Sequence, residues 1–169
     1  GIHWFDQVLW WAKEATPHII HASGGRAIKE DNTTAPDHLY CNFAFEDFTC
    51  TWEHRQFAGT PHEKHNIGVY FYGTKGVFHL GWRDGWTFYP QGRGQKEIHE
   101  DAVFNNPDSE NIAGLWADLI ESIEKNKKPV CDIQYGFNAT CMSLLSINSW
   151  QLGRSIRWNQ ETCNVIEDP

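Results

Sequence analysis

Residues 67–90 read IGVYFYGTKGVFHLGWRDGWTFYP and contain three short runs rich in valine and aromatic residues. The first two runs are joined through Gly73-Thr74-Lys75-Gly76, and Asp84-Gly85 precedes the third. Runs of this composition, bounded by turn residues, predict β-strands, and an Asp-Gly pair between such runs is a strong hairpin signal. The segment therefore predicts antiparallel strands joined in sequence order, which is a β-meander.

The chain on both sides of this segment continues the same pattern. Two alternating runs around Glu46-Asp47 predict a second hairpin, and a polar stretch before it predicts an excursion loop. The middle of the chain thus predicts an antiparallel meander of about six strands. The predicted ranges are a strand at 18–25, the loop at 26–37, strands at 38–45 and 48–57, and a further short strand near 96–99.

Helices are predicted at the two ends of the chain. Residues 2 to about 14 form an apolar arc at helical spacing. A helical period also begins near Ile112, with Ser109 or Asn111 as N-cap, and again near Gln134, with Gly153 as a C-cap. The SIRWN segment that follows is expected to form an edge strand. The order of one helix, a set of strands and two helices predicts a single α+β domain over residues 1–169. Its architecture is expected to be an open antiparallel β-sheet of about six or more strands with helices packed on one face.

Composition and charge narrow the classes of partner. The formal net charge is -8, with 14 Lys and Arg against 22 Asp and Glu, so neither nucleic acid nor a membrane surface is expected as a partner. No apolar run approaches the roughly 20 residues that span a bilayer. The five cysteines are scattered without a CxxC pair, which argues against disulfides and a zinc site. The only methionine is Met142, so we expect the chain to be part of a longer protein.

The first helix carries a polar strip on an otherwise apolar surface. His3 and Asp6 are spaced i, i+3 and so share one face, where a single neighbour or ligand could contact both. The positive end of the helix macrodipole favours a neutral imidazole, and a carboxylate one turn later can orient it. Such a pair suits general acid–base work at a hydroxyl or carbonyl. By spacing alone, a structural capping pair is the favoured alternative.

Two further groups of residues suggest binding chemistry. Trp52, Glu53, His54 and Arg55 could hold a sugar by stacking and hydrogen bonds, but strand alternation divides them between two faces, so at most two serve one site. The alternative is a core Trp52 with a surface Glu53–Arg55 pair. The HEKH motif at 62–65 places two histidines in a predicted loop, where a solvated loop is favoured over metal binding. No metal and no cofactor are expected to bind within the chain.

Several motifs together resemble a known family. They are the opening GIHWFDQVLWW, then ASGGR, TWEHRQF, VYFYGTKGVFHLGW, ADLIESIEKNKKPVCDI and the final QLGRSIRWN. In this combination the chain resembles the C-terminal domain of the Gfo/Idh/MocA oxidoreductases, the glucose-fructose oxidoreductase and inositol dehydrogenase family. The most specific elements are the HxxD opening with a tryptophan on the same helix, the YGTKG turn, and Lys-Lys-Pro followed by an acidic residue.

The resemblance implies a role for particular residues. It implies that His3 is the acid–base residue at the substrate hydroxyl and that Asp6 orients it. We expect substrate contacts from Trp10 on the same helix and from one face of the strand, either Trp52 with His54 or Glu53 with Arg55. The NAD or NADP of the parent enzyme is implied to bind an N-terminal Rossmann domain that is absent here and that also holds the catalytic lysine. The isolated chain is therefore expected to be inactive.

The predicted function is that of a substrate-binding and oligomerisation domain of an NAD(P)-dependent dehydrogenase. Its expected partners are a sugar, cyclitol or related polyol, the missing Rossmann domain, and further copies of itself through the open sheet face. One alternative is a non-catalytic carbohydrate-binding or assembly module, suggested by nine tryptophans and an uncovered sheet. Another is a parent enzyme that uses bound nicotinamide for a non-redox step.

Overall fold

The computed structural model describes residues 1–13, 16–28, 30–57, 65 and 67–166. The chain divides into two compact units, one formed by Gly1–Gly59 with Gln134–Pro169 and the other by Thr60–Ile133. Helices and two antiparallel sheets within the described ranges confirm the predicted α+β class. The prediction of a single domain stays a prediction.

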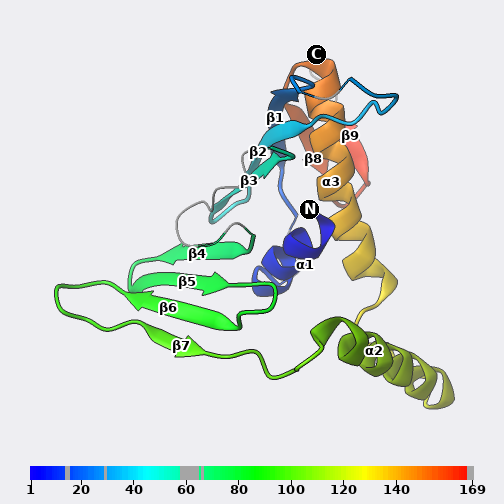
Figure 1. Ribbon diagram of the computed structural model, residues 1–169. Helices are drawn as coiled ribbons and strands as arrows, with labels where there is room; N and C mark the ends of the chain where they lie inside the picture. Colours follow the sequence, from blue (N-terminus) through cyan, green and yellow to red (C-terminus); the bar gives the residue numbers. More distant parts are fainter. Residues whose placement is uncertain (14–15, 29, 58–64, 66, 167–169) are drawn as a thin grey trace. The chain divides into compact units, whose positions relative to one another are not determined.

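The first unit contains a five-stranded antiparallel sheet and two helices (Figure 1). The sheet has the order β3-β2-β1-β8-β9, and α3 runs alongside it. Its strands therefore combine the N-terminal half of the chain with the last residues. The elements are α1 (Ile2–Trp11), β1 (Ile19–Gly25), β2 (His38–Ala44), β3 (Thr49–Arg55), α3 (Ile133–Leu152), β8 (Ile156–Asn159) and β9 (Asn164–Ile166).

The core of this unit lies between one face of the sheet and the two helices. Phe43 of β2 is paired with Ile20 of β1 and Cys50 of β3, and this row is covered by helical side chains. In β2 every second residue is buried, and because paired residues point to the same face, the residues opposite them in β1 and β3 share the helix-covered side. This arrangement confirms the predicted packing of helices on one face of a sheet. The helical residues in the core are Phe5 and Leu9 of α1 and Ala139, Met142 and Leu145 of α3.

Polar side chains of α3 also join this packing. Ser149 is fully buried, and its Oγ accepts a hydrogen bond from the backbone N–H of Ala22 at 2.9 Å and donates one to the carbonyl of Arg154 at 2.7 Å. Trp150 donates from Nε1 to the carbonyl of Gly24 at 3.0 Å. These bonds fix α3 against β1 and leave the buried hydroxyl satisfied.

Two details differ from the sequence-based expectation. The first helix ends at Trp11 instead of near Glu14, because Lys13 adopts a positive φ of 57° that a right-handed helix cannot contain. The SIRWN segment was expected to form an edge strand, but β8 lies inside the sheet, between β1 and β9. The short β9 follows a turn that the sequence pattern did not reveal.

The predicted excursion loop after β1 is held by a buried carboxylate. Oδ2 of Asp37 accepts hydrogen bonds from the backbone N–H of Ala27 at 2.9 Å and of Ile28 at 2.7 Å. Its Oδ1 lies 2.8 Å from Nδ1 of His38, the first residue of β2. These contacts hold the start of the loop against its end, where the chain enters β2.

The second unit contains a separate four-stranded sheet with the order β4-β5-β6-β7. The antiparallel strands predicted over residues 67–90 are confirmed, but they form a sheet of their own, so the strands of the predicted meander are divided between two sheets. Thr74 and Lys75 form the β4–β5 turn, and Gly85 adopts a φ of 64° that favours glycine at the β5–β6 connection. The elements are β4 (Val69–Gly73), β5 (Gly76–Leu80), β6 (Trp86–Pro90), β7 (Ile98–Glu100) and α2 (Pro107–Glu124).

The helix α2 has the amphipathic pattern that the sequence predicted, but its apolar face stays exposed. Ile112, Trp116 and Ile123 are each more than half exposed. The helix begins at Pro107 with Asn106 as N-cap, earlier than the predicted cap at Ser109 or Asn111, because proline is well suited to the first turn. No helix within the described ranges is long and apolar enough to cross a bilayer.

Candidate functional site

The predicted catalytic pair lies at the beginning of α1. His3 is exposed in the first turn, and Asp6 is half-buried one turn further on. The buried side of the same helix packs on β3, where the ring of Phe5 lies edge-on to Trp52 with centroids 5.3 Å apart. The apolar contact thus fixes the helix, while the polar strip remains accessible.

The start of α1 also lies close to the end of β3. A β-carbon built on Gly1 would lie 3.6 Å from Cζ2 of Trp52. Burial lowers the pKa of His54, whose side chain lies near the backbone nitrogen of Gly1. An aromatic ring and a second imidazole therefore border the end of the helix that carries His3.

The four predicted residues of β3 divide between the two sheet faces, as strand alternation requires. Trp52 is paired with the buried Cys41, so it lies on the face that the helices cover, and His54 shares that face. Glu53 and Arg55 lie on the opposite face, where their side chains form an ion pair of 3.1 Å. Only Trp52 and His54 are placed on the side of the sheet that carries α1.

Trp10 is the third predicted residue of the polar strip. It is 70% exposed and follows Asp6 by four positions, so it lies one turn further along the same side of α1. His3, Asp6 and Trp10 thus lie along one side of α1. Trp52 and His54 lie near the beginning of that helix.

The electrostatic state of Asp6 reflects its partial burial. Desolvation raises the pKa of the Asp6 carboxyl, and the nearby His3 opposes this shift. The charged form of Asp6 is therefore less stable in the folded protein than in the unfolded chain. A carboxyl group with a raised pKa beside His3 is consistent with a functional role.

Replacing Asp6 by asparagine is expected to increase the free energy of unfolding at neutral pH. The pKa of Asp6 lies above the ordinary 3.8 in the folded protein. Between 3.8 and the raised pKa the folded state binds more protons than the unfolded chain, so the free energy of unfolding falls as pH rises through this range. The asparagine side chain does not titrate, so the variant does not lose this stability as pH rises. Urea denaturation at pH 7 and below pH 3.8 measures the difference, which should vanish at the lower pH. Asp47→Asn, at an exposed turn, is the control, and a variant less stable than wild type at pH 7 contradicts the prediction.

Burial makes three of the five cysteines poor nucleophiles. All five are free thiols. Burial raises the pKa of Cys50 to about 12, and it also raises the pKa of Cys41 and Cys141. A thiol with a raised pKa is protonated at neutral pH and reacts poorly.

The described strands lack the parallel arrangement of a Rossmann-type dinucleotide site. Every strand pair among them is antiparallel. A Rossmann site needs parallel strands joined by a helix whose N-terminus receives the pyrophosphate. The strands that the structure describes therefore do not form a Rossmann-type dinucleotide site.

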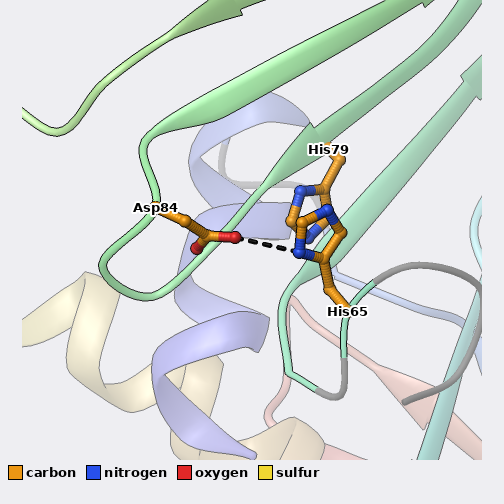
Figure 2. Close-up of side chains that lie close together, drawn as sticks. All are labelled: His65, His79 and Asp84. Atoms are coloured by element: carbon orange, nitrogen blue, oxygen red, sulfur yellow. Dashed lines mark ion pairs between the residues drawn. The ribbon is translucent and has the colours of Figure 1, made fainter.

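A second group of polar side chains was missed by sequence reasoning. His65, His79 and Asp84 lie together in the second unit (Figure 2). The HEKH motif paired His65 with His62 instead, and His62 lies outside the described residues. The sequence did offer one signal for this cluster, namely a histidine within the VFHL strand that is followed closely by an Asp-Gly turn.

Comparison with known proteins supports the fold. No protein-family model and no curated protein matches the chain. Aldose-aldose oxidoreductase from Caulobacter crescentus, solved with glycerol, matches 93% of the chain with a TM-score of 0.68 and 13% identity. An oxidoreductase from Agrobacterium radiobacter in complex with NAD+, L-tartaric acid and magnesium matches 93% with a TM-score of 0.66 and 10% identity. A super-repressor mutant of Gal80p from Saccharomyces cerevisiae matches 92% with a TM-score of 0.65 and 16% identity.

The chain spans about half the length of these structures, namely 45%, 47% and 47%. At such low identity the similarity establishes the fold and no residue roles. The chain thus has a fold that several oxidoreductases contain as one half of their structure. One of these related proteins was solved with NAD+ and another with glycerol.

Proposed function

We propose that the chain is the substrate-binding half of a Gfo/Idh/MocA-type, NAD(P)-dependent dehydrogenase that acts on a sugar, cyclitol or related polyol. The observation that carries the proposal is the accessible His3–Asp6 pair at the start of α1, beside Trp52 and His54. The fold shared with an aldose-aldose oxidoreductase supports the substrate class. The nicotinamide supplies the redox chemistry and binds outside the described residues.

The proposed task of this chain is proton transfer and substrate positioning. The exposed imidazole of His3 exchanges a proton with the reacting hydroxyl or carbonyl oxygen of the substrate. The carboxylate of Asp6 interacts electrostatically with that imidazole and orients it for the transfer. The indoles of Trp10 and Trp52 offer apolar surfaces for the C–H groups of a sugar ring.

The face of β3 that contacts substrate is proposed to be that of Trp52 and His54. These residues share the helix-covered side of the sheet with the start of α1, whereas Glu53 and Arg55 face away from it. A substrate held at His3 can therefore contact the first pair and not the second. Subunit association is proposed to use the open face of the second sheet, where Phe71, Phe78 and Phe88 are only partly buried.

Substitutions of two adjacent residues on opposite faces of β3 test which face contacts the substrate. His54→Gln in the longer protein that contains this chain is expected to raise KM for the sugar or polyol about tenfold, the effect of one lost hydrogen bond in the site. Arg55→Ala, one residue further on the opposite face, is the matched control and should leave KM and kcat within about twofold. Steady-state kinetics with NAD and with NADP measures both. The reverse ranking of the two variants would place the substrate on the Glu53–Arg55 face.

A second candidate function is a non-catalytic binding or assembly module. It is favoured by the similarity of the fold to that of Gal80p, whose solved form is a super-repressor mutant. Calorimetric titration of the chain with monosaccharides separates the two functions. Saturable sugar binding without a nucleotide-binding partner supports the module, and turnover of a polyol by the longer protein supports the dehydrogenase.

A further inference from the structure

Three metal-ligand side chains converge in the second unit, away from the residues used above. One ligand atom of each of His65, His79 and Asp84 lies within 4.8 Å of the others. Nδ1 of His65 lies 2.9 Å from Oδ2 of Asp84, and the two imidazole rings stack with centroids 3.9 Å apart (Figure 2). We propose that these three side chains bind one transition-metal ion, with Zn²⁺ as the preferred ion.

The convergence comes from three separate parts of the second unit. His65 precedes β4, His79 lies within β5, and Asp84 lies in the connection from β5 to β6. His79 is 1% exposed, and the ring of Tyr70, its partner in the β4–β5 register, lies 4.5 Å from it. The sheet therefore fixes one ligand, and the two connecting segments bring the other two to it.

Two glycines allow this close approach. A β-carbon on Gly68 would lie 2.4 Å from Nε2 of His79, and one on Gly81 would lie 1.8 Å from Oδ1 of Asp84. Both distances are too short for any other residue type without a shift of the ligand side chain. The backbone around the cluster thus leaves space beside two of the three ligands.

The composition of the cluster selects the class of ion. Two imidazole nitrogens and one carboxylate form the ligand set of many zinc sites that keep a fourth position open for water. Calcium and magnesium prefer sites made of oxygen atoms, so a cluster with one carboxylate and two imidazoles does not suit them. An ion pair between His65 and Asp84 would involve only these two residues. A metal ion would also use the buried imidazole of His79, which stacks on His65.

Binding requires a small rearrangement that the burial pattern permits. In a tetrahedral zinc site, bonds of about 2.0–2.2 Å place ligand atoms roughly 3.3–3.5 Å apart, which lies between the closest 2.9 Å and the upper bound of 4.8 Å in the cluster. Because imidazole donates in its ring plane, the parallel rings must turn relative to each other. The side chain of His65 is 26% exposed and that of Asp84 is 46% exposed, so these two move while His79 stays fixed.

The expected consequence is a metal cross-link within the second unit. The ion would join the segment before β4 to the β5–β6 connection, and its binding energy would stabilise the folded unit. This proposal does not depend on the dehydrogenase proposal, because the latter uses residues of the first unit. Failure of either one leaves the other intact.

The test uses the 169-residue chain after treatment with a chelator and desalting. Titration with Co²⁺, followed by visible absorption, and with Zn²⁺, followed by calorimetry, is expected to show one ion per chain and a higher melting temperature. His65→Gln, His79→Gln and Asp84→Asn are each expected to weaken binding about tenfold or more. His99→Gln is the matched control, because His99 pairs with Asp101 at 3.2 Å in the same sheet without belonging to the three-residue cluster.

A further variant separates the cluster from the sequence motif. His62→Gln should leave binding unchanged if the ligands are His79 and Asp84. Binding that is lost in His62→Gln and kept in Asp84→Asn overturns the proposal, as does a wild-type chain that takes up no ion. If His79→Gln fails to fold, the two more exposed ligands, His65 and Asp84, decide the result.

Discussion

Replacing His3 by alanine in the proposed dehydrogenase is expected to lower kcat/KM about 10²–10⁴-fold, the usual contribution of a general acid–base residue. The imidazole is exposed and contributes nothing to the core of the first unit. Its removal should therefore leave the fold intact while it removes the proposed proton acceptor at the substrate hydroxyl. Steady-state kinetics on the preferred polyol measures the loss, and circular dichroism verifies folding.

The control for this variant is a histidine on the far side of the sheet. His21 of β1 is exposed and points away from the helices, since its neighbours Ile20 and Ala22 are buried. His21→Ala should leave kcat/KM within about twofold, as expected for a surface substitution. If His3→Ala behaves like His21→Ala, the assignment of proton transfer to His3 is wrong.

Replacing Phe43 by alanine is expected to reduce the free energy of unfolding by about 3–5 kcal/mol. Phe43 is 0% exposed, and its ring packs edge-on against Phe5 with centroids 5.1 Å apart. The truncation removes apolar contacts on both sides, from β1 and β3 and from α1, and leaves a cavity that the packed sheet cannot fill. Urea or guanidinium denaturation measures the change.

Tyr40 is the matched control for Phe43. It is an aromatic residue of the same strand, it is 44% exposed, and it lies on the opposite sheet face. Tyr40→Ala should reduce the free energy of unfolding by about 1 kcal/mol or less. Equal losses in the two variants would mean that the buried face of β2 is not the centre of the core.

Local patterns were sufficient to predict most of the elements. The alternation in HLYCNFAF and FTCTWEHRQF predicts two paired strands, and β2 and β3 lie within those ranges. The period of two also predicted that Trp52 and Glu53 occupy different faces. Both properties follow from the geometry of a single strand, where successive side chains point to opposite sides.

Contacts between distant segments were not predictable in this way. Nothing in SIRWN indicates that β8 would lie between β1 and β9, and the meander did not reveal that its strands form a sheet of their own. The apolar spacing of α2 predicted a helix that packs on a core, yet Ile112 and Trp116 remain largely exposed. Hydrophobic spacing shows which side of an element is apolar, but it does not show what covers that side.

The two candidate sites show the same division. His3 and Asp6 could be paired from the sequence because one turn of helix separates them, and this spacing is a property of the helix itself. His65, His79 and Asp84 come from a loop, a strand and a turn, so no sequence period relates them. Their meeting depends on the β4–β5 register and on the close approach that Gly68 and Gly81 allow. Backbone periodicity therefore determined the elements and the helical pair, whereas only strand pairing in the folded chain brought the three ligand side chains together.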